Sequence, residues 1–143
     1  MKVVHSVSLE AFMYPTEDMD KVRKALDLVL PEKAKLRKEK VDSYYGPSIV
    51  RLVFETNKAA EIKRMLEKMG SKLSKEERAE IVGGIDERMD ENGNFYLRFD
   101  KQKAYSGQLV LGYKGDVIKT RIKIASFPAN LSNMKYNAKI LFE

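Results

Sequence analysis

The pattern of apolar and polar residues is most regular near the C-terminal end of the chain. In residues 117–127, Ile118, Ile122 and Ile124 fall on one parity. The opposite parity holds the cations Lys119, Arg121 and Lys123. Successive side chains of a β-strand point to opposite faces, so this segment predicts a strand with one buried face and a row of cations on the other. Such cations lie about 6.5–7 Å apart, close to the phosphate spacing of a nucleic-acid strand. A solvated strand surface gives the same pattern, so both interpretations are open.

The rest of the chain divides into segments of strand-like and helical pattern. Strands are predicted over residues 3–13, 33–41, 49–55, 94–100, 108–113 and 117–127. Helical spacing predicts helices over residues 17–30, 58–69 and 75–89, and the last fourteen residues, which fit both periods, are assigned to a helix. This order predicts a single α+β domain over residues 1–143, with two layers in which helices pack on one face of a mainly antiparallel sheet.

Turn and capping residues set the expected boundaries of these elements. Ser74 and Glu77 form a capping box at the start of the third helix, and Gly70 is expected to end the helix before it. Residues 44–47 and 100–105 are expected to be turns. Gly83 and Gly84 fall inside the third helix, where each costs about 1 kcal/mol relative to Ala. We interpret them as a close helix–sheet contact, with a hinge as the alternative.

Composition restricts the chemistry. The chain of 143 residues has no cysteine and one histidine, His5, which excludes disulfides, thiol catalysis and multi-histidine metal sites. We expect no cofactor. No stretch is long and apolar enough for a membrane helix, and the N-terminus lacks the features of a signal peptide, so a cytoplasmic location is expected.

The net charge of +6 is distributed unevenly. Residues 33–72 and 117–143 are basic, whereas residues 74–92 are rich in Glu and Asp. A basic side and an acidic side favour oriented docking on a polyanion. Asp86, Asp90 and Asp100 are the acids that a metal-dependent nuclease would use, although acids crowded on one helix are typical of a solvated surface.

Cations alternate with aromatic residues between residues 96 and 123. Tyr96 and Arg98 share the polar parity of their strand, and Lys101, Lys103 and Tyr105 follow directly. Arg and Lys contact phosphates, and Tyr stacks on unpaired bases or bonds a ribose hydroxyl. If the C-terminal strands are neighbours in the sheet, these side chains and the cation row of residues 119–123 share one open face.

Several segments resemble an archaeal family of RNA-binding proteins and predicted exosome subunits. They are FYLRFDKQKAY at 95–105, RIKIASFPA at 121–129, PTED at 15–18, VRKALDLVLPE at 22–32 and YYGPSIVRL at 44–52. The resemblance spans essentially the whole chain. It implies a fold similar to a large-subunit ribosomal protein that binds small ribosomal RNA, a homodimer, and a role near the RNA-processing machinery: exosome, RNase P or ribosome assembly. By the motif match it also implies that Arg98, Lys101, Gln102 and Tyr105 contact RNA.

The favoured hypothesis is a non-catalytic RNA-binding protein that contacts the phosphates of structured RNA. The candidate RNA contacts are Tyr96, Arg98, Lys101, Gln102, Lys103, Tyr105, Lys119, Arg121 and Lys123. The alternatives are a dimeric scaffold that binds an acidic protein and no RNA, and a metal-dependent nuclease. The hypothesis requires the cations of separate C-terminal segments to lie in one solvent-facing patch.

Overall fold

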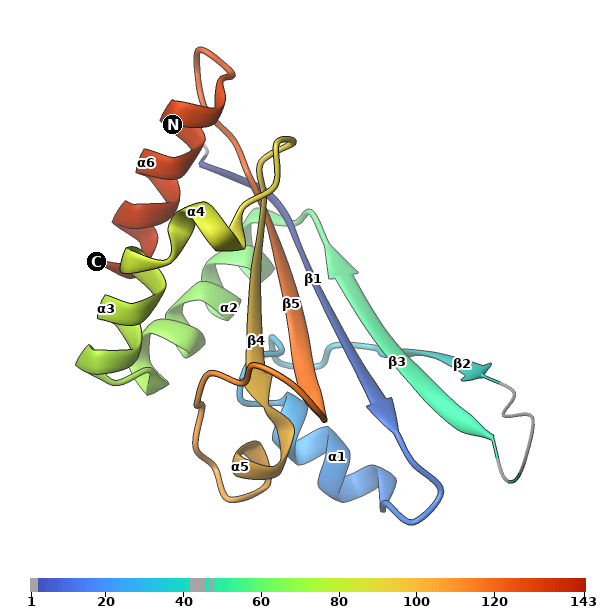
Figure 1. Ribbon diagram of the computed structural model, residues 1–143. Coiled ribbons are helices and arrows are strands. Elements are labelled where there is room, and N and C mark those ends of the chain that lie inside the picture. The colour runs from blue at the N-terminus through green and yellow to red at the C-terminus, as the bar shows by residue number, and fades with distance from the viewer. Residues whose placement is uncertain (1–2, 42–45, 47) are drawn as a thin grey trace.

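A five-stranded antiparallel sheet forms the centre of the molecule (Figure 1). The computed structural model describes residues 3–41, 46 and 48–143. The strands are β1 (Val4–Met13), β2 (Arg37–Val41), β3 (Ile49–Thr56), β4 (Asn94–Asp100) and β5 (Val117–Ile124). Their order is β2-β3-β1-β5-β4, and every neighbouring pair is antiparallel. The first strand is therefore central, and β2 and β4 are the edges.

Six helices complete the described part of the chain. They are α1 (Met19–Leu26), α2 (Ala59–Lys72), α3 (Lys75–Gly83), α4 (Ile85–Arg88), α5 (Lys101–Tyr105) and α6 (Leu131–Phe142). In Figure 1, α1 and α5 lie at the lower end of the sheet, and α3, α4 and α6 lie to its left. The predicted α+β class, a mainly antiparallel sheet with helices packed on it, is confirmed. Among the described residues, no helix has the length and apolar character needed to cross a bilayer.

Alternation along the strands separates a buried face from an open face. In β5 the even-numbered residues are buried and the odd-numbered ones are partly exposed, as the sequence predicts. The buried side chains of β1, β4 and β5 pack with those of α2 and α3 in one core, where Leu9, Leu97, Met65 and Ile81 are fully or almost fully buried. Burial of each such side chain stabilises the fold by about 1.5–3 kcal/mol. The opposite face of the sheet retains the polar residues.

Helix starts follow local capping chemistry. Ser74 Oγ accepts a hydrogen bond from the N–H of Glu77 at 3.0 Å, which confirms the Ser74 half of the predicted capping box. The Glu77 carboxylate instead accepts from the N–H of Leu111 at 3.0 Å. The cap of α1 is Asp18, whose carboxylate accepts from the N–H of Asp20 at 2.9 Å. This helix ends at Leu26, earlier than the predicted residue 30, although Val29 and Leu30 are still buried. Apolar residues beyond a helix end can fill the core from a turn.

Other boundaries differ from the prediction. Helix α2 continues through Gly70 to Lys72. It ends at Leu73, whose backbone is extended and whose N–H donates to the Met69 carbonyl oxygen. The third helix is interrupted at Gly84, which separates α3 from α4. Our interpretation of a close helix–sheet contact is wrong: a Cβ on Gly83 would have no neighbour within 4 Å, and one on Gly84 would meet only atoms of α3 and α4.

The segment between β4 and β5 also differs. The expected turn at 100–105 contains α5, because the Asp100 carboxylate accepts from the N–H of Lys103 at 3.0 Å and caps a short helix. The expected strand at 108–113 is an irregular segment that forms one isolated bridge, between Phe99 and Leu111. The C-terminal helix is confirmed as α6. The turn expected at residues 44–47 lies outside the described residues, apart from Gly46.

Candidate nucleic-acid interface

The strand register brings cations of β4 and β5 together on the open face. Residues of β4 stand opposite residues of β5: Asn94 opposite Lys123, Tyr96 opposite Arg121, and Arg98 opposite Lys119. Residues directly opposite in an antiparallel pair have Cβ atoms about 4.5–5.5 Å apart. We call the set Tyr96, Arg98, Lys119, Arg121 and Lys123 the cationic face. The predicted convergence of side chains from two C-terminal strands is therefore present.

The cations of this face have few partners. The Lys119 ammonium lies 5.2 Å from the centre of the Tyr96 ring, a cation–π contact. Among the described residues, the side chain of Arg98 makes no hydrogen bond or ion pair. Arg121 has one distant acidic neighbour, Glu55, at 3.8 Å, and its Nε is buried without an acceptor among the described residues. The Arg121 side chain as a whole is 37% exposed, so an anionic ligand can pair with its exposed part.

Lys123 lies next to the turn at residues 90–94. Its ammonium donates to the carbonyl oxygen of Asn92 at 2.5 Å. Burial on its own raises the pKa of the neighbouring Asp90 carboxyl, but hydrogen bonds from Asn94 and Asn92 and the charge of Lys123 outweigh it, so the pKa lies below its usual value. No ion pair in the described part of the chain joins an acid of α3 or α4 to the cationic face. The acidic helices therefore leave it accessible.

The other half of the open face is neutralised. Arg51 of β3 bridges two glutamates, with Nη2 2.6 Å from Glu10 Oε2 and Nη1 2.7 Å from Glu39 Oε2. Arg37 Nε lies 2.9 Å from Glu39 Oε1. The hydrogen bonds to Glu10 and then Glu39 raise the pKa of Arg51 further, so its charge is permanent. We call Glu10, Arg37, Glu39 and Arg51 the paired half.

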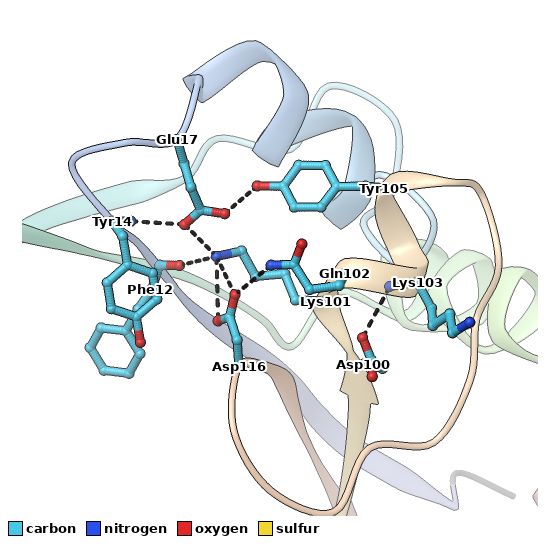
Figure 2. A network of polar contacts seen from close by, with 9 residues as sticks. All are labelled: Phe12, Tyr14, Glu17, Asp100, Lys101, Gln102, Lys103, Tyr105 and Asp116. Atoms are coloured by element: carbon cyan, nitrogen blue, oxygen red, sulfur yellow. Dashed lines mark hydrogen bonds and ion pairs between the residues drawn. The ribbon is translucent and has the colours of Figure 1, made fainter.

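Lys101, another predicted contact, is buried at the end of β4 (Figure 2). Its side chain is 0% exposed. The ammonium donates to the Phe12 carbonyl at 2.6 Å, to Glu17 Oε1 at 2.7 Å and to Asp116 Oδ2 at 3.1 Å. It also lies 5.2 Å from the centre of the Tyr14 ring. A buried ammonium needs such partners, and here they come from three separate segments.

Two more predicted residues belong to the same cluster. Gln102 Nε2 donates to Asp116 Oδ2 at 3.1 Å, and the Tyr105 hydroxyl donates to Glu17 Oε2. Burial opposes the charge of Glu17, but hydrogen bonds from Lys101, Tyr105 and the Tyr14 N–H hold the pKa of Glu17 below its usual value (Figure 2). Burial and the bond to Glu17 raise the pKa of Tyr105. We call Glu17, Lys101, Gln102, Tyr105 and Asp116 the Lys101 cluster.

Eight of the nine candidate contacts are thus divided between two places, and Lys103 lies in neither. Five of them make up the cationic face, and Lys101, Gln102 and Tyr105 belong to the Lys101 cluster. Lys103 is exposed on α5. One signal in the sequence does mark Lys101, because it continues the inward parity of Phe95, Leu97 and Phe99.

The acids considered for a nuclease each have a local role. Asp86 pairs with Lys135 at 2.9 Å, Asp90 binds the turn of residues 92–94, and Asp100 caps α5. Within residues 3–41, 46 and 48–143, no group of three or more His, Cys, Asp or Glu side chains is arranged to hold a metal ion.

Comparison with known proteins places the chain in a family. The chain is 36% identical over 129 residues to RNA-binding protein PAB1135 of Pyrococcus abyssi, covering 87% of this chain and 84% of that protein. Its fold is similar to that of protein AF2318 from Archaeoglobus fulgidus, with a TM-score of 0.85, 28% identity and coverage of 96% of this chain and 99% of that one.

A second solved structure gives the same result. Mth689, a DUF54 protein from Methanothermobacter thermautotrophicus, has a TM-score of 0.83 and 30% identity, covering 99% of this chain and 100% of that one.

The model of a family described as RNA binding matches residues 6–124, which include all five strands except the first two residues of β1. The chain belongs to this RNA-binding family.

Proposed function

We propose that this protein binds structured RNA through the cationic face and catalyses no reaction on it. The observation that carries the proposal is the register of β4 and β5, which sets Arg98, Lys119, Arg121 and Lys123 around Tyr96 on the face opposite the core. Membership of an RNA-binding family supports the choice of ligand. Lys103, exposed on α5, is an additional RNA contact outside the cationic face. Lys101, Gln102 and Tyr105 have a structural role in the Lys101 cluster.

The chemistry of the face favours the recognition of phosphates over the recognition of sequence. Lysine and arginine side chains displace counterions from the RNA backbone, and this term does not depend on the bases. With four phosphate contacts, the logarithm of the association constant falls with the logarithm of salt concentration at a slope of about −3 to −4. Tyr96 presents an aromatic ring among these cations, as in surfaces that stack an unpaired base.

The test measures the binding of a labelled RNA hairpin by fluorescence anisotropy at several salt concentrations. The variant replaces Arg98, Lys119, Arg121 and Lys123 by Gln, which removes charge without placing a new carboxylate opposite Glu55. We expect about a 100-fold loss of affinity at physiological salt and a nearly flat salt dependence. The control replaces Lys21, Lys24, Lys63 and Lys75 by Gln, an equal change in charge on exposed helix positions. Equal losses in both variants contradict a localised interface.

The family resemblance supports two further proposals. One is association with the RNA-processing machinery (exosome, RNase P or ribosome assembly), and the other is a homodimer. A pull-down from native lysate, with and without RNase, tests the first, because partners held only through RNA disappear after nuclease treatment.

Light scattering of the purified chain tests the second proposal, the homodimer. A mass of one chain at all concentrations contradicts the homodimer.

A further inference from the structure

A hollow lies on the outer edge of β4, directly beside the cationic face. Its volume is about 560 Å³, within the usual range of about 300–1,000 Å³ for small-ligand sites. Tyr96 and Arg98 of β4 form one wall, and the junction of α3 and α4 forms another. Gly112 and Tyr113 complete it. Because Tyr96 and Arg98 line both surfaces, the hollow is continuous with the cationic face.

Glycines at two positions shape this hollow. At Gly84, between α3 and α4, a Cβ would lie 3.2 Å from the Glu80 carbonyl oxygen and 3.5 Å from Arg88 Nε. At Gly112 a Cβ would lie 3.0 Å from the backbone N of Asp100. The N–H of Gly112 donates to the carbonyl oxygen of Arg98 at 2.8 Å. The segment that carries Tyr113 is therefore fixed against the edge of β4.

Several of the lining side chains are available for a ligand, whereas the Asp90 carboxylate already accepts hydrogen bonds from Asn92 and Asn94. Tyr113 is 64% exposed, so the face of its ring is open to a ligand. Among the described residues, the carboxylates of Glu80 and Glu87 make no hydrogen bond or ion pair, nor do the guanidinium groups of Arg88 and Arg98. The hollow therefore combines an aromatic surface with uncommitted donors and uncommitted acceptors.

This combination matches the chemistry of an unpaired nucleobase. Aromatic side chains and arginine planes stack on bases that are splayed out of a helix. Carboxylates accept from base amino groups, and arginine donates to O6 and N7 of guanine. Guanine satisfies both kinds of group, since its N1–H and amino group donate to a carboxylate at two points, whereas uracil offers a carboxylate only its single N3–H.

We propose that the hollow holds an unpaired base, guanine in preference to uracil, of the RNA strand whose phosphates contact the cationic face. This inference rests on the proposed function and adds to it the part of the RNA that is recognised. Arg98 lies at the junction, opposite Lys119 in register, so it lies beside the phosphate that precedes or follows the bound base. Tyr113 stacks on the base, and Glu80 or Glu87 accepts its amino hydrogens.

The experiment compares three RNA hairpins that differ at one position: a bulged G, a bulged U, and no bulge. Affinities are measured by fluorescence anisotropy at one salt concentration. We expect the bulged-G hairpin to bind about 10-fold more tightly than the fully paired one, and the bulged-U hairpin to lie between them. Tyr113→Ala abolishes the advantage of the bulge and leaves binding of the paired hairpin unchanged. The double variant Glu80→Gln/Glu87→Gln reduces the preference for G over U.

Tyr136→Ala is the matched control, because Tyr136 on α6 is also 64% exposed but does not line the hollow. It should retain the full preference. Equal affinity of the wild type for all three hairpins, or a Tyr113→Ala loss that is equal for all three, overturns the base site and leaves the cationic face standing. Absence of binding to any hairpin overturns the proposed function itself. If Tyr113→Ala does not fold, the G-over-U preference of the Glu80→Gln/Glu87→Gln double variant decides, and an unchanged preference overturns the base site.

Discussion

The cationic face and the Lys101 cluster use similar residues in opposite circumstances. On the face, Lys119 is partly exposed, and within the described part of the chain its ammonium makes no hydrogen bond or ion pair but lies over the ring of Tyr96. In the cluster, Lys101 is fully buried, and its ammonium donates to oxygen atoms of Phe12, Glu17 and Asp116 (Figure 2). The first arrangement leaves charge available to a ligand, and the second uses all of it inside the protein. The surroundings of a lysine, more than its presence in a motif, therefore decide whether it can bind RNA.

The largest expected effect is on stability, from Lys101→Met. Removing the ammonium leaves Glu17 and Asp116 without their cation in a mostly buried site, which costs about 3–5 kcal/mol of unfolding free energy. Urea denaturation measures it. Lys103→Met, two residues away and exposed, should change stability by less than about 0.5 kcal/mol. Similar effects of the two substitutions would falsify the structural role of Lys101.

The second prediction concerns acid stability. The folded-state pKa of Glu17 is lowered from its ordinary value of 4.5, so its contribution is complete above about pH 4.5 and disappears as the pH falls through the lower folded-state value. Glu17→Gln should be less stable at pH 7 by about 1–3 kcal/mol and should lose less stability on acidification. Urea midpoints between pH 3 and pH 7 measure this. Glu91→Gln, an exposed control, should follow the wild type.

The third prediction concerns affinity. Arg121→Gln should weaken binding of an RNA hairpin about 5- to 10-fold at low salt and reduce the salt slope by about 1, because one phosphate contact is lost. Its ion pair with Glu55 is long and partly exposed, so stability should change by less than about 1 kcal/mol. A large fall in thermal midpoint together with unchanged RNA affinity would show that Arg121 stabilises the fold and does not contact RNA.

The smallest expected effect is that of Arg37→Gln in the paired half. Arg37 is exposed and already pairs with Glu39 at 2.9 Å, so its loss should change RNA affinity by less than about 3-fold. The same anisotropy titration measures it, side by side with Arg121→Gln. An equal loss for the two arginines shows that the RNA covers the whole open face.

Much of the fold could be predicted from the sequence, because most strands have one solvent-exposed face and one buried face. Alternation located β4 and β5, and the Ser74–Glu77 pattern located the start of α3. The segment 108–113 misled the prediction since Leu109 and Leu111 are both buried and alternate. Its backbone bonds to β4 at two points only, which is too few for a strand.

The site was harder to predict, because it depends on partners that are distant along the chain. The Arg51–Glu10 contact joins β3 to β1, and Arg121 meets Glu55 across β1. Neither pair can be identified before the strand order is known. The cations of β5 could be located from alternation, but the acids that neutralise one half of the sheet could not.

The burial of Lys101 also bears on how the chain folds during synthesis. Its ammonium bonds to residues 89 and 84 positions earlier and to Asp116, which the ribosome adds later. The central strand β1 likewise lacks its partner on one side until β5 has been made. Residues 3–100 therefore emerge before the cation that pairs with Glu17 and before the strand that pairs with one edge of β1, and both are supplied only by residues 101–124.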